Sequence, residues 1–326
     1  MYRRIAVIGA GFCGLAVAWH LSKRDQVTLY DTLDIGAGTS GMASGLLHPY
    51  VGVQSKLNWM GREGYAATVK LLNESQKVLG KPVVNMNKGI IRLALVQEQE
   101  LNFRASAATY PDVEWLNADQ IREKAPDAAY FPGIFITEGL TVYSSLYLEG
   151  LWKGCQQRGV AFEKKKISSL AEVDGYDLVI ITAGALTQEI PELSALPLNQ
   201  LKGQLLELKW PQNIPPLKYP LNSHVYLLMT ENNHSCIVGG TYERGFTHAG
   251  PDIEKAKEEL LPKLKVMYPP LKNPEVIACR AGIRSGAPNR LPFIKQMGPK
   301  HWVLAGMGSK GLLYHALMAE KLVSQV

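Results

Sequence analysis

Hydrophobic residues at the start of the chain follow two different periods. Residues 4–8 form a short apolar run ending at Gly9, which is typical of a strand buried on both faces of a parallel sheet. Apolar positions then repeat at helical spacing from Phe12 to about Lys23, and a second strand over residues 27–30 ends at Asp31. This order of elements predicts a parallel βαβ unit.

Later segments alternate between this pattern and a pattern of short helical pieces or strands interrupted by prolines. Helical spacing recurs at 64–79, 146–159 and 310–324, and apolar runs at 89–96, 176–182 and 302–305 predict strands. Between them, residues 97–140 mix acidic helical pieces with prolines, and residues 200–275 alternate strands with prolines. We therefore expect an α/β fold with a discontinuous Rossmann-like domain over 1–80, 141–200 and 276–326, and an α+β domain with a mixed or antiparallel sheet over 81–140 and 201–275.

The composition excludes several classes of protein. With 326 residues, 46% of them apolar and 20% charged, the chain can bury a large core and is neither disordered nor fibrous. Its four cysteines form no CxxC pair, so we expect neither a metal site nor a disulfide framework, and a cytoplasmic location fits best. No apolar run is long enough to predict a membrane helix, and the net charge of +6 predicts at most a mild attraction to anions or RNA.

A glycine-rich turn after the first strand carries the clearest chemistry. Gly9, Gly11 and Gly14 fit the GxGxxG pattern between a strand and a helix, and Asp31 ends the next strand. The glycines permit a tight turn, a close approach of a pyrophosphate and close packing of helix on strand, while the acid can bind ribose hydroxyls. The motif predicts a bound dinucleotide, but it does not separate NAD from FAD.

Three further segments favour FAD. They are the small-residue loop over residues 36–49, the strand ending in Thr-Ala-Gly at 182–184, and Gly-Met-Gly-Ser-Lys-Gly at 306–311. Together with Gly203-Gln204, residues 239–244 and residues 282–292, they resemble the D-amino-acid oxidase family of flavoenzymes, particularly glycine oxidase and the oxidoreductase half of the bifunctional enzyme that completes 5-methylaminomethyl-uridine in tRNA. The resemblance extends through nearly the whole chain.

This resemblance implies positions for the cofactor. FAD would be bound noncovalently, because Met42 stands where some relatives attach flavin through a histidine. Gly308 to Gly311 would place the positive N-terminal end of the last helix beside the pyrimidine part of the flavin. This end would stabilise the negative charge that accumulates there on reduction. The expected cofactor-binding residues are Gly9, Gly11, Gly14, Asp31, Ser44, Gly45, Ala183, Gly184, Gly308, Ser309, Lys310 and Gly311.

The resemblance also implies a substrate site. Arg284 matches the arginine that binds the substrate carboxylate in glycine oxidase, and a guanidinium fork suits a planar carboxylate. Leu46 and His48 would lie near the reactive face of the flavin, and Tyr242 would line the pocket. Each polar candidate also has a structural interpretation: Arg284 as an ion-pair partner, Tyr242 as a core tyrosine, and His48 as a packed side chain.

We therefore expect an FAD-dependent oxidoreductase that oxidises a C–N bond of an amino acid or amine by hydride transfer to flavin N5, leaving an imine that water hydrolyses. One alternative is the oxidation of a modified tRNA uridine, although this chain lacks the methyltransferase half of the bifunctional enzyme. The other is a flavin-bearing assembly or interaction protein without turnover. A small amine or amino acid is the expected partner, with tRNA as a second possibility.

Overall fold

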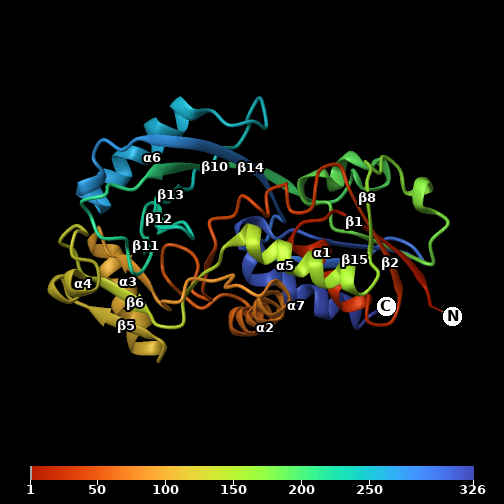
Figure 1. Cartoon of the computed structure of the whole chain (residues 1–326), viewed down its shortest axis with the longest axis horizontal. Helices are drawn as coiled ribbons and strands as arrows, with labels where there is room; N and C mark the ends of the chain where they lie inside the picture. Colours follow the sequence, from red (N-terminus) through yellow and green to blue (C-terminus); the bar gives the residue numbers. More distant parts are fainter. Residues whose placement is uncertain (1) are drawn as a thin grey trace.

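The computed structural model describes residues 2–326 and arranges most strands in two large sheets. One sheet lies on the right of Figure 1, where the chain begins and ends, and the other lies on the left beneath a long helix. Each sheet has its own buried apolar clusters. The expected α/β fold, with a Rossmann-like part and a second part built on a mixed sheet, is confirmed.

The six-stranded sheet contains segments that are far apart in the sequence. Its strands, in spatial order, are β15 (Phe293–Gln296), β16 (His301–Ala305), β9 (Leu178–Ile181), β1 (Arg4–Ile8), β2 (Gln26–Asp31) and β8 (Ala161–Lys164). All pairs are parallel except β15 with β16. The central strands read as continuous apolar runs because helices cover one of their faces and the 3₁₀ turns of residues 170–193 pack on the other.

The eight-stranded sheet is mainly antiparallel. In spatial order it contains β14 (Val276–Gly286), β10 (Asn199–Lys209), β13 (Ser235–Gly239), β12 (Tyr226–Met229), β11 (Leu221–Asn222), β4 (Ile90–Leu93), β6 (Gly133–Ile136) and β5 (Val113–Leu116). Only β11 and β4 pair in parallel. A two-stranded ladder of β3 (Leu46–Leu47) and β7 (Leu140–Thr141) lies apart from both sheets.

Seven α-helices cover these sheets, and their apolar faces explain where they pack. They are α1 (Phe12–Leu21), α2 (Gly61–Leu79), α3 (Gln97–Thr109), α4 (Ala118–Lys124), α5 (Ser144–Gln157), α6 (Ile253–Met267) and α7 (Gly311–Val323). On α6 the buried residues Ala256, Leu260 and Leu264 recur every fourth position, which places one apolar stripe on the eight-stranded sheet (Figure 1).

Helices α1, α2, α5 and α7 form one layer against the six-stranded sheet. A Cβ on Gly64 of α2 would lie 2.6 Å from the carbonyl oxygen of Leu313, so these two helices approach each other at backbone distance. The Thr68 hydroxyl donates to the Leu312 carbonyl, also across this contact, at 3.1 Å. The start of α7 is therefore held firmly by α2.

Most predicted elements occur within a few residues of their expected bounds. The helix expected over 64–79 begins at Gly61, and the strand expected over 89–96 contracts to Ile90–Leu93. Strand β14 lies in the segment 276–326, yet it pairs with β10 in the eight-stranded sheet. Within the described residues, no helix has the length and apolar content that a membrane crossing requires.

Candidate functional site

The glycine turn between β1 and α1 has no room for side chains. Gly9 has a φ of +108°, and a Cβ on it would lie 2.5 Å from the Thr182 carbonyl oxygen. A Cβ on Gly14 would lie 1.7 Å from the Gly9 carbonyl oxygen, and one on Gly11 would lie 2.7 Å from the Ser40 hydroxyl. Gly9 and Gly14 therefore require glycine because of backbone neighbours, whereas a side chain at Gly11 would displace the Ser40 hydroxyl.

Helix α1 begins at this turn with its positive end exposed to a ligand. Its N-cap, Gly11, has no side chain to accept a hydrogen bond, and its first turn contains no acidic residue. The Phe12 amide donates to the Ser40 hydroxyl at 3.0 Å. The helix dipole and the other amides of this first turn are suited to an anion such as a pyrophosphate.

Asp31 lies beside the same turn at the end of β2. One carboxylate oxygen accepts from the Ala10 amide at 2.7 Å, and the other accepts from the Leu33 amide at 3.0 Å. Two backbone donors thus hold the carboxylate at the edge of a small pocket of about 40 Å³. This arrangement fits a ribose whose hydroxyls reach the carboxylate.

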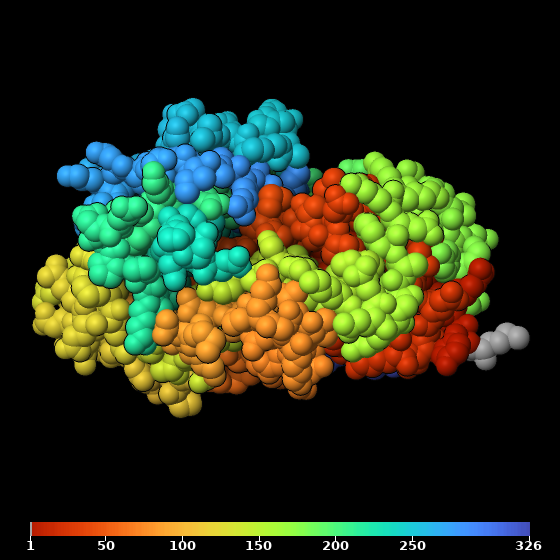
Figure 2. Space-filling model, in the orientation of Figure 1, coloured from red at the N-terminus to blue at the C-terminus, as the bar shows by residue number. Residues whose placement is uncertain are grey.

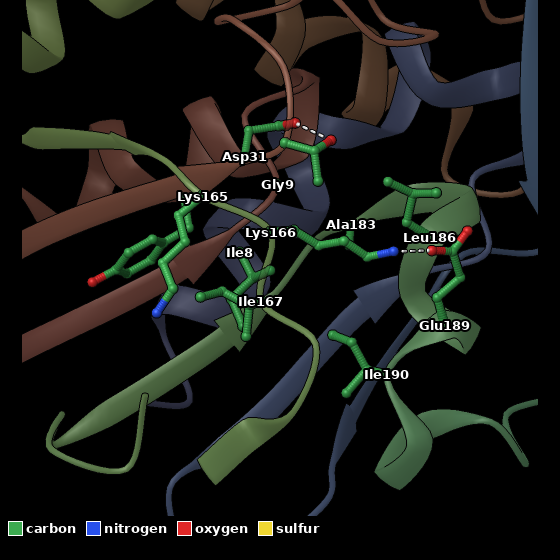
Figure 3. A pocket seen from close by; sticks show the side chains of 12 residues that line it. Ile8, Gly9, Asp31, Lys165, Lys166, Ile167, Ala183, Leu186, Glu189 and Ile190 are labelled. Atoms are coloured by element: carbon green, nitrogen blue, oxygen red, sulfur yellow. Dashed lines mark hydrogen bonds and ion pairs between the residues drawn. The ribbon is translucent and has the colours of Figure 1, made fainter. Parts of the chain in front are cut away.

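The pocket beside Asp31 is lined by residues of several segments that are distant in the sequence (Figure 3). Apolar walls come from Ile167, Leu186 and Ile190, and Ala183 lies next to the glycine turn. An ion pair at 2.8 Å between Lys166 and Glu189 joins two segments of the rim. The sequence did not identify these wall residues, because they come from loops whose proximity depends on the strand order.

The small-residue loop leads from this nucleotide pocket toward the eight-stranded sheet. Gly45 has a φ of +91°, and a Cβ on it would lie 1.9 Å from the Val142 carbonyl oxygen. The Ser144 hydroxyl donates to the Ala43 carbonyl at 3.1 Å, and Leu46 pairs with Thr141. The loop that contains Ser44 and Gly45 is therefore pinned along an extended path between the two sheets.

The expected flavin-binding turn before α7 lies at the end of β14. Met307 forms an isolated bridge with Gly286, and Gly308 has a φ of +55°. Residues Gly308–Lys310 form a 3₁₀ turn that leads into α7 at Gly311, and the first turn of α7 contains no acidic residue. Burial lowers the pKa of Lys310, with Arg290 adding to the effect, and its ammonium donates to the Arg290 carbonyl at 3.4 Å.

Arg284 occupies a cradle made by glycines on the neighbouring strands. A Cβ on Gly203 would lie 2.3 Å from a guanidinium nitrogen of Arg284, and one on Gly240 would lie 3.1 Å from the same atom. The guanidinium donates to the Thr241 carbonyl at 3.1 Å and packs over the Tyr242 ring at 4.8 Å. Within the described residues it forms no ion pair, so its charge is available to a ligand.

Tyr226 meets this cradle from β12. A Cβ on Gly239 would lie 2.3 Å from the Tyr226 hydroxyl, and one on Gly240 would lie 3.2 Å from it. Burial raises the pKa of Tyr226, and the neighbouring Arg284 and Ser44 oppose that rise. A guanidinium and a phenol thus converge over β13, beside the loop that carries Ser44.

Strand register places further polar residues on the same face of the sheet. Tyr226 pairs with both Gly239 and Asn222, and Asn222 pairs with Arg92. Directly paired residues point to the same side of a sheet, so all four positions share the face that carries Arg284. Sequence reasoning missed Tyr226, Asn222 and Arg92, because no sequence motif marks them.

His48 lies close to Arg92 in a fully enclosed position. It is 3% exposed, and its Nδ1 has no hydrogen-bond partner. Burial, with a smaller contribution from Arg92, lowers the pKa of His48 to about 3. The imidazole is therefore neutral at ordinary pH and is a weak base. Arg92 itself donates to the carbonyls of Tyr50 and Gly52 at 3.0 and 2.7 Å.

The expected site residues thus form two groups that meet between the sheets. Gly9, Gly11, Gly14, Asp31, Ala183 and Gly184 surround the start of α1, whereas Arg284, Tyr242, Leu46 and Ser44 gather near Tyr226. In Figure 2, atoms of the small-residue loop over residues 36–49, coloured red, face those near β12 and β13, coloured teal, across a hollow at the centre of the molecule.

Several known proteins are similar to this chain in sequence or in structure. The sequence is 23% identical to "Glycine oxidase" from Bacillus licheniformis over 98% of this chain and 92% of that protein. It is 27% identical to the "tRNA 5-methylaminomethyl-2-thiouridine biosynthesis bifunctional protein MnmC" of Delftia acidovorans over 99% of this chain, but only 58% of that protein. The crystal structure of glycine oxidase from Geobacillus kaustophilus superposes with a TM-score of 0.86 at 20% identity, covering 99% of this chain and 94% of that one.

A family model described as "DAO: FAD dependent oxidoreductase" matches residues 4–325. The start of α1, the glycine turn and the Asp31 carboxylate at the end of β2 all fit the FAD that this family uses. The chain therefore belongs to the DAO family of FAD-dependent oxidoreductases, and its cofactor is FAD.

Proposed function

We propose that the protein oxidises a carbon–nitrogen bond of a small amino acid or secondary amine that carries a carboxylate. The observation that carries this proposal is the unpaired Arg284 guanidinium in its glycine cradle, next to the Tyr226 hydroxyl. A guanidinium without an acidic partner, held over small residues, can accept a planar carboxylate through two parallel hydrogen bonds. Tyr226 can donate a further hydrogen bond to the same carboxylate.

Arg284, Tyr226 and their neighbours would orient the substrate. Bound FAD would supply the two-electron oxidation of the carbon–nitrogen bond, and water would then hydrolyse the imine product. Arg284 and Tyr226 fix the carboxylate end, while Leu46, which packs beside Tyr226, supplies an apolar wall that excludes water. The neutral, enclosed His48 would shape the site instead of removing a proton, because a pKa of about 3 makes it a poor base.

A screen for reduction of the bound flavin tests this proposal. The purified protein is mixed without oxygen with glycine, N-methylglycine, iminodiacetate, D-alanine, L-proline and matched amines without a carboxylate, and the flavin absorbance is followed. We expect bleaching by at least one amino acid, with faster reduction by the acid than by its decarboxylated counterpart. If none of these compounds reduces the flavin, a small amino acid is not the substrate.

One observation favours the second candidate, oxidation of a modified uridine side chain in tRNA. Tyr242 lies over Arg284 with 64% of its surface exposed, so the entrance beside Arg284 is not closed and can admit an amine attached to a large molecule. The similarity to the tRNA-modifying bifunctional proteins agrees with this function. Digestion of tRNA after incubation with the protein, followed by mass spectrometry of the nucleosides, would reveal a shortened uridine side chain.

If neither amines nor tRNA reduced the flavin, a non-catalytic flavin protein would be the remaining function. The proposal also includes noncovalent attachment of FAD. Acid precipitation should leave the yellow flavin in the supernatant, and colour that stays with the precipitated chain would contradict this part.

A further inference from the structure

A buried imidazole lies between the two helix starts that face the cofactor site. His315, on the second turn of α7, is fully buried, and its ring centroid lies 5.1 Å from that of Phe12, the first residue of α1. Phe12 belongs to the glycine turn, and its amide faces Ser40. His315 therefore contacts the residue that begins the pyrophosphate-binding helix while it is itself part of the helix expected at the flavin ring.

The hydrogen bonds of His315 fix the orientation of its ring. Nδ1 lies 3.1 Å from the carbonyl oxygens of both Gly311 and Leu312, and carbonyls can only accept, so Nδ1 carries the proton. Nε2 must then accept from the Tyr147 hydroxyl, which lies 2.7 Å away. Burial lowers the pKa of His315 to about 4, which keeps this single neutral form at ordinary pH.

Tyr147 extends the network to two more helices. It is fully buried on α5, and its backbone carbonyl accepts from the Ser75 hydroxyl of α2 at 2.9 Å. Its ring packs on Phe12 at 5.9 Å and on His315 at 5.6 Å. The imidazole and the phenol thus connect the first turn of α7 with α1 and α5, and the backbone of Tyr147 adds a hydrogen bond to α2. Every polar atom of the imidazole has a partner.

This arrangement has a consequence for the cofactor because FAD has two ends. The residues around α1 would hold the adenosine and pyrophosphate, and those at the start of α7 would hold the flavin end. A ligand that spans two sites gains affinity only when their separation is right. We propose that His315 and Tyr147 are positioning residues, which hold the start of α7 at the distance and angle from α1 that bound FAD requires. They contact neither substrate nor flavin in this role. The inference depends on the FAD dependence of the family and not on the proposed substrate.

The test compares FAD with ADP, which occupies only the α1 end. In His315→Ala, we expect the dissociation constant for FAD to rise tenfold or more, while that for ADP changes by less than twofold. Loss of general stability would weaken both ligands together. Equal weakening of FAD and ADP, or no change in either, would therefore overturn the proposal.

Tyr147→Phe is the second variant, because it keeps the aromatic packing and removes only the hydroxyl that donates a hydrogen bond to His315. We expect a two- to tenfold rise in the dissociation constant for FAD, the range that the loss of one neutral hydrogen bond produces. The control is Tyr130→Phe, whose hydroxyl donates to the Asp119 carboxylate at 2.9 Å and lies outside this network. It should leave the ratio of FAD to ADP affinity unchanged.

A spectroscopic measurement on the bound flavin supplies an independent readout. If the start of α7 shifts, the field at the flavin ring changes, so the midpoint potential and the fine structure of the visible absorption band should differ between wild type and Tyr147→Phe. Identical potentials and spectra in the two proteins, together with unchanged FAD affinity, would show that the network only fills the core.

Discussion

At the scale of single residues, Arg284 distinguishes between substrate classes. Arg284→Lys should keep FAD bound and lose reactivity with acids, because an ammonium cannot reproduce the two parallel hydrogen bonds of a guanidinium. Charged hydrogen bonds contribute roughly 1.5 to 3 kcal/mol, so the rate of flavin reduction per unit substrate should fall about tenfold to more than a hundredfold. Stopped-flow reduction by an amino acid and by its decarboxylated amine measures the effect.

Arg280 provides the matched control for this experiment. It lies on the same strand and the same face as Arg284, but it pairs with Glu207. Arg280→Lys should leave both rates near those of the wild type. An equal loss with the acid and the amine in Arg284→Lys would instead mean that Arg284 supports the site without binding a carboxylate.

Gly11 should be the most sensitive single position for cofactor binding. Gly11→Val should abolish detectable FAD binding, because its Cβ alone would approach the Ser40 hydroxyl to 2.7 Å and the two methyl groups would fill the space in front of α1. Asp31→Ala should weaken binding less, since it removes only hydrogen bonds to ribose. Fluorescence titration gives both dissociation constants. Gly175→Val is the control, where the nearest atom is an Arg4 nitrogen at 3.9 Å, and FAD affinity that survives in Gly11→Val would refute this placement.

At the scale of elements, the close packing of β10, β13 and β14 creates the glycine cradle of Arg284, where we propose that substrate binds. Gly203→Ala should therefore impair the site without touching a substrate, because the new Cβ would lie 2.3–2.5 Å from the Arg284 guanidinium and force it to move. We expect the apparent affinity for a carboxylate substrate to fall at least tenfold, with FAD affinity unchanged. Steady-state KM and FAD titration measure the two effects.

Gly250→Ala is the control for Gly203→Ala, because the nearest atom to a Cβ on Gly250 is a His248 ring nitrogen at 3.7 Å. It should change neither constant. If Gly203→Ala bound substrate as tightly as the wild type, the cradle would not set the position of Arg284.

The elements also show what could and could not be predicted from sequence. The glycine turn and Asp31 were predictable, because local spacing in a βαβ unit determines where they lie. Tyr226 was not, since its place beside Arg284 depends on the order β14, β10, β13, β12, which no local pattern encodes. His48 was expected near the flavin, but the depth of its burial, and hence its low basicity, depends on how Arg92 and the following loop pack over it.

At the scale of the whole molecule, buried histidines should govern stability at mildly acidic pH. Burial lowers the pKa of His20 and of His315 to about 4, and that of His48 to about 3. Between these values and the unfolded pKa near 6.5, the unfolded chain binds more protons than the folded one, so stability falls as the pH drops. The loss can reach about 1.4 kcal/mol per pH unit for each histidine.

Urea unfolding at pH 7.0, 6.0 and 5.0 checks this expectation. The midpoint should fall steadily through the series in the wild type, and His20→Gln should reduce the slope because one titrating group is removed. Surface histidines such as His234 offer the control, and His234→Gln should leave the slope unchanged. Constant stability from pH 7 to 5 would mean that the histidines are protonated in the folded chain.

The order of strands in the six-stranded sheet has a consequence for how the protein is made. β1 pairs with β9, as Ile5 does with Leu178, and β9 pairs on its other side with β16, as Ile180 does with Trp302. The three neighbouring strands are therefore widely separated in the sequence. A ribosome delivers the glycine turn early but the flanking strands and α7 only late, and such non-local pairing is slow. FAD can therefore be captured only after β9, β16 and α7 have been synthesised, long after the glycine turn. Until β16 pairs with it, one apolar edge of β9 lacks its neighbour, and chains that fold without flavin would lack the ligand that stabilises them.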